Sequence, residues 1–253
     1  RVLDVPTVAV YQTDVAGFAG SYGIGVMADA AWAWTRALHM HCDRTLAPST
    51  AAIDDLAAHG IPRLHRWGRG VDTARFSPHR RSEALHRLWS PEGRPVVGFV
   101  GRLAPEKHVE RLRELADRSG PEGDLQLVVV GDGPDRAALQ AAMPHAIFTG
   151  ELHGEQLGQA YATMDVFCHP GEFETFCQAI QEAQASGVPV VGPDRGGPRD
   201  LVRAGINGYL LDPRTYAAEV SAAVDRVLAD HERLAAGALE TIAGRTWDAI
   251  CGQ

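Results

Sequence analysis

The apolar positions in the later part of the chain fall into short runs that alternate with amphipathic stretches. From Pro95 onward the runs are apolar at nearly every position, and each is followed by a segment with helical spacing. Strands that are apolar on both faces and alternate with helices predict a parallel sheet covered on both sides, a doubly wound α/β domain. We expect strands at 95–101, 125–131, 146–150, 165–170, 189–193 and 208–211, and helices at 108–120, 135–144, 155–164, 176–187, 197–205 and 215–234.

The first part of the chain has the same α/β character with fewer elements. We expect strands at 7–13, 44–49 and 63–72, and helices at 26–43 and 50–60. Ser49 is the expected N-cap of the second of these helices. The segment 77–95 is polar and contains several Pro and Gly residues, so we place a domain boundary at its start. The predicted domains are therefore 1–76 and 77–253.

Composition and charge exclude several classes of function. The 253 residues are 45% apolar, which suffices for one large or two ordinary domains, and the net charge of −8 argues against nucleic-acid binding. The four cysteines lack both C-x-x-C spacing and the density of a disulfide scaffold, so we expect reduced thiols in a cytosolic protein. No apolar run reaches the length of a membrane span. Because the first residues contain neither an initiating Met nor a signal peptide, we expect the chain to begin within a longer protein.

The loop "GRLAPEK" at 101–107 is the first candidate site. Gly101 allows a sharp turn after a strand, and Arg102 and Lys107 flank the turn that precedes a helix. Two cations beside a helix N-terminus suit a phosphate group, although solvated charges on a surface turn are the alternative. Lys107 is the only lysine among 24 basic residues, which favours a site that requires a compact ammonium group.

The segment "ETFCQAIQE" is the second candidate site. Glu174 precedes a predicted helix, and Glu182 lies eight residues later, about two turns inside it. The two carboxylates can bind the hydroxyls of two rings, while the backbone amides of Phe176 and Cys177 donate to one of them. A solvated helix with spaced glutamates is the alternative. It is disfavoured because Glu182 lies in an apolar register, where a carboxylate without a partner would be costly.

Other polar motifs carry less information. The turns "GDGP" at 131–134 and "RGGPRDLV" at 195–202 follow strands, and alone they indicate ordinary turns or a close approach of a ligand. The sequence "HMHCD" resembles a metal-binding motif, but His39 and His41 would lie on different faces of a helix. We therefore expect no metal site there, and we find no motif for a nucleophile.

Six motifs in register resemble those of the retaining glycosyltransferases with the GT-B fold, and more narrowly glycosyltransferase family 4. They are "GRLAPEK", "GDGP", "FTGEL", "ETFCQAIQE", "ASGVPVV" and "GGPRDLV", and the earlier "WGRGVDTARFSP" resembles the end of that family's first lobe. The resemblance implies a complete nucleotide-sugar-binding lobe at 77–253 and the later part of an acceptor-side Rossmann-like lobe at 1–76. "AVYQTDVAGFA" and "WGRGVD" look most similar to actinobacterial GDP-mannose-dependent lipid mannosyltransferases.

The resemblance also implies roles for these residues. Arg102 and Lys107 match the cationic pair that binds the donor diphosphate, with Gly101 at the turn before them. Glu174 matches the carboxylate at the hydroxyls of the donor sugar, and Glu182 the one at the ribose hydroxyls.

Four further donor-binding positions rest on backbone atoms or on a departure from the family. Phe176 and Cys177 match the backbone donors, and Leu152 falls where the backbone of the family meets the base. Gln12 stands where family members commonly have a histidine. Because Gln can hydrogen-bond to a sugar hydroxyl but cannot titrate, we assign it no general-base role.

The expected function is transfer of a hexose, best matched by mannose from GDP-mannose, to an acceptor hydroxyl with retention. The catalytic residues would be Arg102, Lys107 and Glu174. Because the positive charges of Arg102 and Lys107 can replace a metal, we expect neither a metal nor a cofactor. The acceptor could be a glycolipid, which would place the protein in the cytoplasm or at the inner face of the plasma membrane. One alternative is a lobe that binds nucleotide sugar but is inactive as this chain. Another is a nucleotide-sugar epimerase, disfavoured because the sequence shows no group of acid/base side chains around a sugar site.

Overall fold

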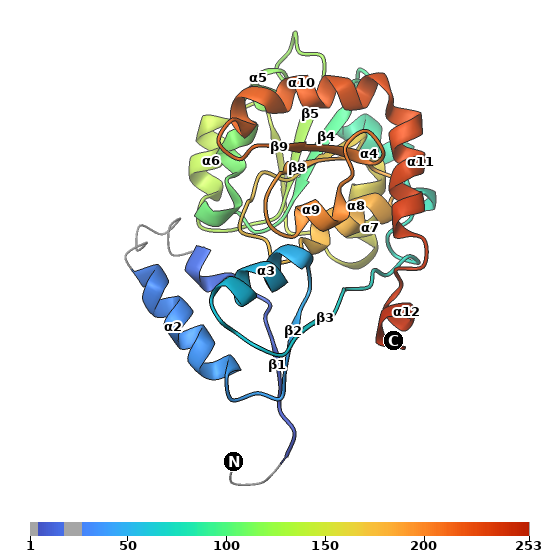
Figure 1. Cartoon of the computed structure of the whole chain (residues 1–253). Coiled ribbons are helices and arrows are strands. Elements are labelled where there is room, and N and C mark those ends of the chain that lie inside the picture. Colours follow the sequence, from blue (N-terminus) through green and yellow to red (C-terminus); the bar gives the residue numbers. More distant parts are fainter. Residues whose placement is uncertain (1–4, 18–26, 253) are drawn as a thin grey trace.

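The protein consists of two lobes, each built on a parallel sheet (Figure 1). The structure is a computed structural model that describes residues 5–17 and 27–252. The first residue of the helix expected at 26–43, and part of the predicted domain 1–76, lie outside the described residues. The two parallel sheets confirm the α/β prediction. The domain boundary expected at residue 77 stays a prediction.

The first lobe contains a three-stranded sheet in the order β1-β2-β3, with one small core. Ser49 caps α3 as expected, because its side chain accepts a hydrogen bond of 3.1 Å from the amide of Ala52. The elements of this lobe whose bounds lie within the described residues are β1 (Val8–Val10), α2 (Ala28–His39), β2 (Arg44–Ala47), α3 (Thr50–Ala58) and β3 (Leu64–Arg66).

The second lobe contains a six-stranded sheet in the order β6-β5-β4-β7-β8-β9. Its strands are β4 (Val96–Val100), β5 (Gln126–Val130), β6 (Ile147–Gly150), β7 (Val166–Cys168), β8 (Val190–Pro193) and β9 (Gly208–Leu211). In chain order this is 3-2-1-4-5-6, the order of a Rossmann-like fold. The connections from β4 and from β7 leave on opposite faces of the sheet, so a crevice opens between the carboxyl ends of these two neighbouring strands.

Two hydrophobic cores, one on each face, hold this sheet between two layers of helices. Alternate strand residues such as Val97 and Val96 point to opposite faces and belong to different cores. One face is covered by η4 (Val109–Leu112), α5 (Arg113–Asp117), α6 (Arg136–Ala142) and α10 (Tyr216–Ala229). The other is covered by α4 (Glu83–Trp89), α7 (Gly154–Thr163), α8 (Gln178–Ala185), α9 (Pro198–Leu201) and α11 (His231–Ile242).

The helix expected at 197–205 is confined to Pro198–Leu201, and two other expected helices are interrupted or begin differently. The helix expected at 215–234 ends at Ala229, and α11 begins at His231, because the backbone of Asp230 is not helical (φ −134°, ψ 33°). The helix expected at 108–120 begins as the 3-10 helix η4 after His108, whose backbone is left-handed (φ 50°). In both cases the amphipathic pattern was correct, but it did not reveal where the backbone turns.

The chain returns to the first lobe at its end. After α11, the amide of Val71 donates to the carbonyl of Arg245 at 2.9 Å, and the last helix, α12 (Trp247–Cys251), lies beside that bridge. Polar contacts join the lobes elsewhere: Asp200 accepts from the amide of Thr50 at 2.7 Å and from Arg66 at 3.0 Å. No helix among the described residues is long and apolar enough to cross a membrane.

Candidate active site

The loop after β4 brings Lys107 to the crevice. Lys107 ends the short 3-10 helix η3 (Pro105–Lys107), and its amide donates to the carbonyl of Ala104 at 2.9 Å. The glycines of "GDGP" let the neighbouring loop approach this one: a Cβ on Gly131 would lie 1.9 Å from the carbonyl oxygen of Gly101. The conformation of the lysine loop therefore depends on a second loop that the sequence alone left as an ordinary turn.

The loop after β7 brings His169 and Glu174 to the same crevice. The amide of His169 donates to the carbonyl of Val191 at 2.9 Å, which continues the sheet pairing one residue beyond β7. The carbonyl of Glu174 accepts from the amide of Gly197 at 2.7 Å, and a Cβ on Gly196 would lie 2.6 Å from that carbonyl oxygen. The double glycine therefore allows the loops after β7 and β8 to pack directly on each other.

Lys107 and Glu174 form an ion pair in this crevice. The Lys107 Nζ lies 2.5 Å from Glu174 Oε1, and the His169 Nε2 lies 3.1 Å from the same oxygen. Burial alone would raise the pKa of the Glu174 carboxyl, but His169 and Lys107 outweigh burial and hold that pKa at about 2. Burial likewise disfavours the Lys107 ammonium, yet Glu174 raises its pKa above the ordinary value. Both groups are therefore charged at neutral pH.

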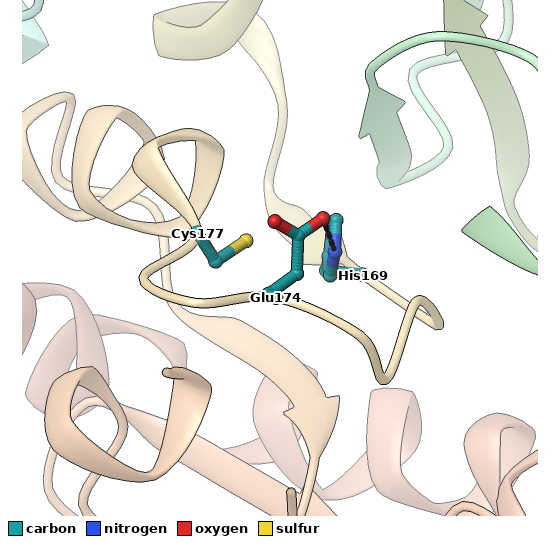
Figure 2. A group of neighbouring side chains, drawn as sticks. All are labelled: His169, Glu174 and Cys177. Carbon is teal, nitrogen blue, oxygen red and sulfur yellow. Dashed lines mark hydrogen bonds and ion pairs between the residues drawn. The ribbon is translucent and has the colours of Figure 1, made fainter. Parts of the chain in front are cut away.

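Cys177 lies on the other side of Glu174 from His169 (Figure 2). It precedes α8 in a left-handed conformation (φ 75°), which is unusual for a residue other than glycine. The amides of Phe176 and Cys177 donate to no described residue, so they are free to donate to a ligand. Burial raises the pKa of the Cys177 thiol, and the charge of Glu174 raises it further. The thiol is therefore neutral, and all four cysteines are free, as expected.

Glu182 lies in α8 in a different environment from Glu174. Burial raises the pKa of its carboxyl to about 7, and the nearby Tyr161 hydroxyl and Arg75 charge offset that effect only in part. The structure thus separates the two glutamates: one is paired with a lysine and ionised, and the other is half-buried and titrates near neutral pH. The charges of both glutamates raise the pKa of the Cys177 thiol.

The pKa of Glu182 predicts that replacing it stabilises the protein at alkaline pH. The pKa of Glu182 in the folded protein is raised above the ordinary 4.5. The free energy of unfolding therefore falls as the pH rises from about 4.5 to about 7. We expect Glu182→Gln to be more stable than the wild type by roughly 2 kcal/mol at pH 8 and equally stable at pH 4.5. Urea denaturation at both pH values measures this, with the exposed Glu219→Gln as the control. An equal effect of Glu182→Gln at the two pH values would contradict it.

The remaining predicted residues have different surroundings. Arg102 is exposed and has no ion-pair partner among the described residues, so its guanidinium is available to an anion. Leu152 is half-buried after β6 and packs against the core on the α8 face. The Gln12 side chain is exposed, and its carbonyl accepts a hydrogen bond of 2.8 Å from the Thr175 hydroxyl. Gln12 is thereby tied to the residue that follows Glu174.

A cavity of about 480 Å³ lies between the lobes next to Glu174. The first lobe contributes an acidic wall to it, and the pKa of Asp55 there is raised by burial and by the charge of Asp14. The residues lining the cavity include Tyr11, Asp14, Thr50, Asp54, Asp55, Glu172, Glu174, Thr175, Arg195, Arg199 and Asp200. Carboxylates on both sides make this a cavity suited to polyhydroxylated molecules.

Sequence reasoning missed two side chains of the site. Glu172 is held by Arg111 and Arg195 at 2.8 Å each, which lowers the pKa of its carboxyl. His169 is almost fully buried and bonds to Glu174, and the sequence motifs did not single it out. Only the position of His169 at the end of a predicted strand could have indicated it.

The His169, Glu174 and Cys177 side chains place three atoms of metal-ligand type within 4.8 Å of one another. The sequence did not reveal this group, because the expectation of no metal rested on histidine spacing. A cation there would compete with Lys107, whose ammonium already lies 2.5 Å from Glu174, and it would require a thiolate that burial disfavours. The donor set therefore fits the lysine better than a metal.

Comparisons with known proteins identify relatives over the whole chain. Residues 81–238 match the family "Glycosyl transferases group 1", and residues 1–75 match "Glycosyltransferase Family 4". A protein of Mycolicibacterium smegmatis, named GDP-mannose-dependent alpha-mannosyltransferase, is 61% identical over the full chain. Proteins of the same name from Mycobacterium tuberculosis and Corynebacterium glutamicum are 57% and 53% identical. The chain spans 66%, 66% and 61% of these three relatives.

Solved structures with the same fold are more distant in sequence. Anabaena HepE, in complex with UDP and glucose, superposes with a TM-score of 0.79 at 20% identity, over 95% of this chain and 67% of that one. Sucrose-phosphate synthase from Thermosynechococcus elongatus gives 0.80 at 23% identity, over 97% and 65%. These likenesses confirm the predicted two-lobed fold.

Proposed function

The chain belongs to the group 1 glycosyltransferases, with a family 4 domain in its first part, and from that premise we propose that it serves mannosyl transfer from GDP-mannose. The acceptor would be a hydroxyl group, and the anomeric configuration would be retained. The observation that carries the proposal is the Lys107–Glu174 pair in the crevice between β4 and β7, next to a cavity suited to sugars.

In this proposal different residues of the crevice bind different parts of the donor. Arg102 and Lys107 bind the diphosphate, with Gly101 at the turn, and Glu174 accepts from hydroxyls of the mannose. The lysine ammonium and the free arginine guanidinium support the first role, and the ionised carboxylate at the cavity supports the second. Glu182 would bind the ribose hydroxyls, an assignment that its half-buried carboxyl favours.

Four further residues would complete the donor site. The free amides of Phe176 and Cys177 would donate to an oxygen of the donor, and the backbone of Leu152 would face the base. Gln12, tied to Thr175 through its carbonyl, would offer its amide to a hydroxyl of the sugar.

The proposed chemistry is departure of the diphosphate from the anomeric carbon. Negative charge grows on the leaving oxygens while positive charge grows on the sugar, so cations held at the diphosphate stabilise the transition state. Such preorganised electrostatic stabilisation is commonly worth several kcal/mol. Arg102, Lys107 and Glu174 are therefore the proposed catalytic residues.

The nucleotide that stabilises the protein against heat tests the proposed donor. A ligand at a hundred times its Kd adds about 2.7 kcal/mol to the free energy of unfolding, which is a measurable increase in Tm. We expect GDP and GDP-mannose to raise the Tm of this chain, and UDP and ADP to raise it less at equal concentration. A larger increase with UDP, or none with any of the four, would contradict the proposal.

The second candidate is a lobe that binds GDP-mannose without transferring mannose. It is favoured by the extent of the chain, which spans 66% of the first two relatives. Release of free mannose from GDP-mannose, or its transfer to an added acceptor, separates the candidates, since a lobe that only binds would show neither despite a clear increase in Tm.

No metal or cofactor is needed in this proposal. The positive charges of Arg102 and of Lys107, once the ammonium has moved from Glu174 to the diphosphate, would supply what a divalent ion would otherwise supply there. We therefore expect EDTA to leave the affinity for GDP-mannose unchanged in a calorimetric titration. A loss of binding that Mg²⁺ or Mn²⁺ restores would contradict this expectation.

We further propose that the acceptor is polyhydroxylated, such as the headgroup of a glycolipid at the cytoplasmic face of the membrane. The acidic wall formed by Asp14, Asp54 and Asp55 supports a neutral, hydroxyl-rich acceptor, because carboxylates accept hydrogen bonds from hydroxyls. Transfer of labelled mannose from GDP-mannose to extracted glycolipids, compared with water-soluble sugars, measures this. Label in the sugars alone would contradict a lipid acceptor.

A further inference from the structure

The two oxygens of the Glu174 carboxylate have different surroundings. Oε1 accepts from both the Lys107 Nζ, at 2.5 Å, and the His169 Nε2, at 3.1 Å. Oε2 accepts from none of the residues that the structure describes. Figure 2 shows the carboxylate between His169 and Cys177, with one oxygen directed at the imidazole and the other directed away from it. Oε1 thus accepts two hydrogen bonds within the protein, while Oε2 can accept one from a ligand.

The imidazole that holds Oε1 is fixed by its own surroundings. His169 is 2% exposed, and its ring stacks with Phe99 and Phe167, at 6.1 Å and 6.4 Å between centroids. Its Nδ1 is buried and has no hydrogen-bond partner among the described residues. An N–H at Nδ1 would be a buried donor without an acceptor, so the favoured tautomer has its proton on Nε2, directed at Glu174.

Binding of the donor would change the partners of Glu174 unequally. Under the proposed function, on which this inference rests, the Lys107 ammonium moves toward the diphosphate and loosens its bond to Oε1. His169 cannot follow, because its ring is buried and stacks with Phe99 and Phe167. The bond from His169 is then the one that keeps Oε2 directed at the sugar.

We propose that His169 is a positioning residue, whose Nε2–H holds Glu174 in the orientation that receives the hydroxyls of the donor sugar. It acts on the sugar through Glu174 and touches neither the diphosphate nor the base. This predicts that loss of His169 weakens binding of a nucleotide that carries a sugar and leaves binding of the bare nucleotide unchanged.

Three replacements separate positioning from packing. In His169→Gln the amide nitrogen can reach about as far as Nε2 and can still donate to Oε1. His169→Asn is also an amide but is one bond shorter, and His169→Phe keeps an aromatic ring without a donor. The Kd values for GDP and for GDP-mannose are measured by calorimetry on each variant of the 253-residue chain, with Tm as the measure of folding.

We expect His169→Gln to keep the wild-type ratio of the two Kd values. His169→Asn and His169→Phe should weaken GDP-mannose binding about tenfold and change GDP binding less than twofold, in line with the loss of one hydrogen bond to a charged group. The proposal would be overturned if His169→Asn and His169→Phe weakened binding of GDP and of GDP-mannose equally. It would also be overturned if both of these variants bound GDP-mannose as tightly as the wild type.

The same titrations distinguish failure of this inference from failure of the proposed function. If the wild-type chain bound neither GDP nor GDP-mannose, the proposed function itself would fail before any variant was made. If His169→Phe does not fold, His169→Asn, which keeps a polar side chain at this position, provides the decisive comparison with His169→Gln.

Discussion

Lys107→Met is expected to weaken binding of GDP and of GDP-mannose together, by roughly 30- to 100-fold each. The ammonium is largely buried, and removing a charged donor of this kind typically costs about 2–3 kcal/mol of binding free energy. Since the diphosphate is common to both ligands, the ratio of their Kd values should change little. Calorimetric titration of each ligand into the wild type and the variant measures both constants.

A matched control and a conservative variant sharpen this prediction. Arg113→Met removes an exposed positive charge in α5, six residues away in sequence, and should leave both Kd values unchanged. Lys107→Arg keeps the charge, but its planar fork can bind both oxygens of Glu174 and hold them. We therefore expect it to restore GDP binding in part, while GDP-mannose binding and turnover stay at least tenfold below wild type. Wild-type turnover in Lys107→Arg would show that a guanidinium serves equally well.

Glu174→Gln should strengthen binding of GDP without strengthening binding of GDP-mannose. In the free protein the Lys107 ammonium is bound to Glu174, and a diphosphate has to compete with that carboxylate. Without the carboxylate charge, GDP should bind roughly three- to tenfold more tightly, because the diphosphate no longer has to break an ion pair to reach Lys107. GDP-mannose should lose that gain because an amide accepts sugar hydroxyls more weakly than a carboxylate, and transfer should fall about 100-fold.

The measurement is the ratio of Kd values for GDP and GDP-mannose in Glu174→Gln and in the control Glu219→Gln. Because the pKa of Glu174 is about 2, its carboxyl stays ionised above pH 4, and the ratio in the wild type should not vary with the titration of this group between pH 5 and 8. A variant that bound GDP more weakly than the wild type would contradict competition between the carboxylate and the diphosphate.

The sequence predicted most of the strands, because apolar runs bounded by Gly and Pro are a local signal. It also pointed to Lys107, which stands out as the only lysine, and to Glu174 and Glu182 through their spacing. The break at Asp230 was missed for a physical reason. Val227 and Leu234, on either side of the break, belong to the same core, so the apolar pattern continues across the point where the backbone leaves the helical conformation.

The partners in the site could not be predicted from local signals. Lys107 and Glu174 are 67 residues apart in sequence, and they meet because β4 and β7 are neighbours in the sheet. Strand order is a property of the assembled fold, and periodicity does not encode it. His169 carried no signal of its own, since a histidine at a strand end is as compatible with a core position as with a site.

A crystal structure of the chain with GDP-mannose tests the central claim most directly. The Lys107 Nζ is predicted to leave Glu174 and to lie about 3 Å from an oxygen of the diphosphate, while Glu174 keeps its bond to His169 and accepts from a mannose hydroxyl. The claim would be contradicted if the nucleotide lay outside the crevice between β4 and β7. It would also be contradicted if Lys107 remained bound to Glu174 with no contact to the diphosphate.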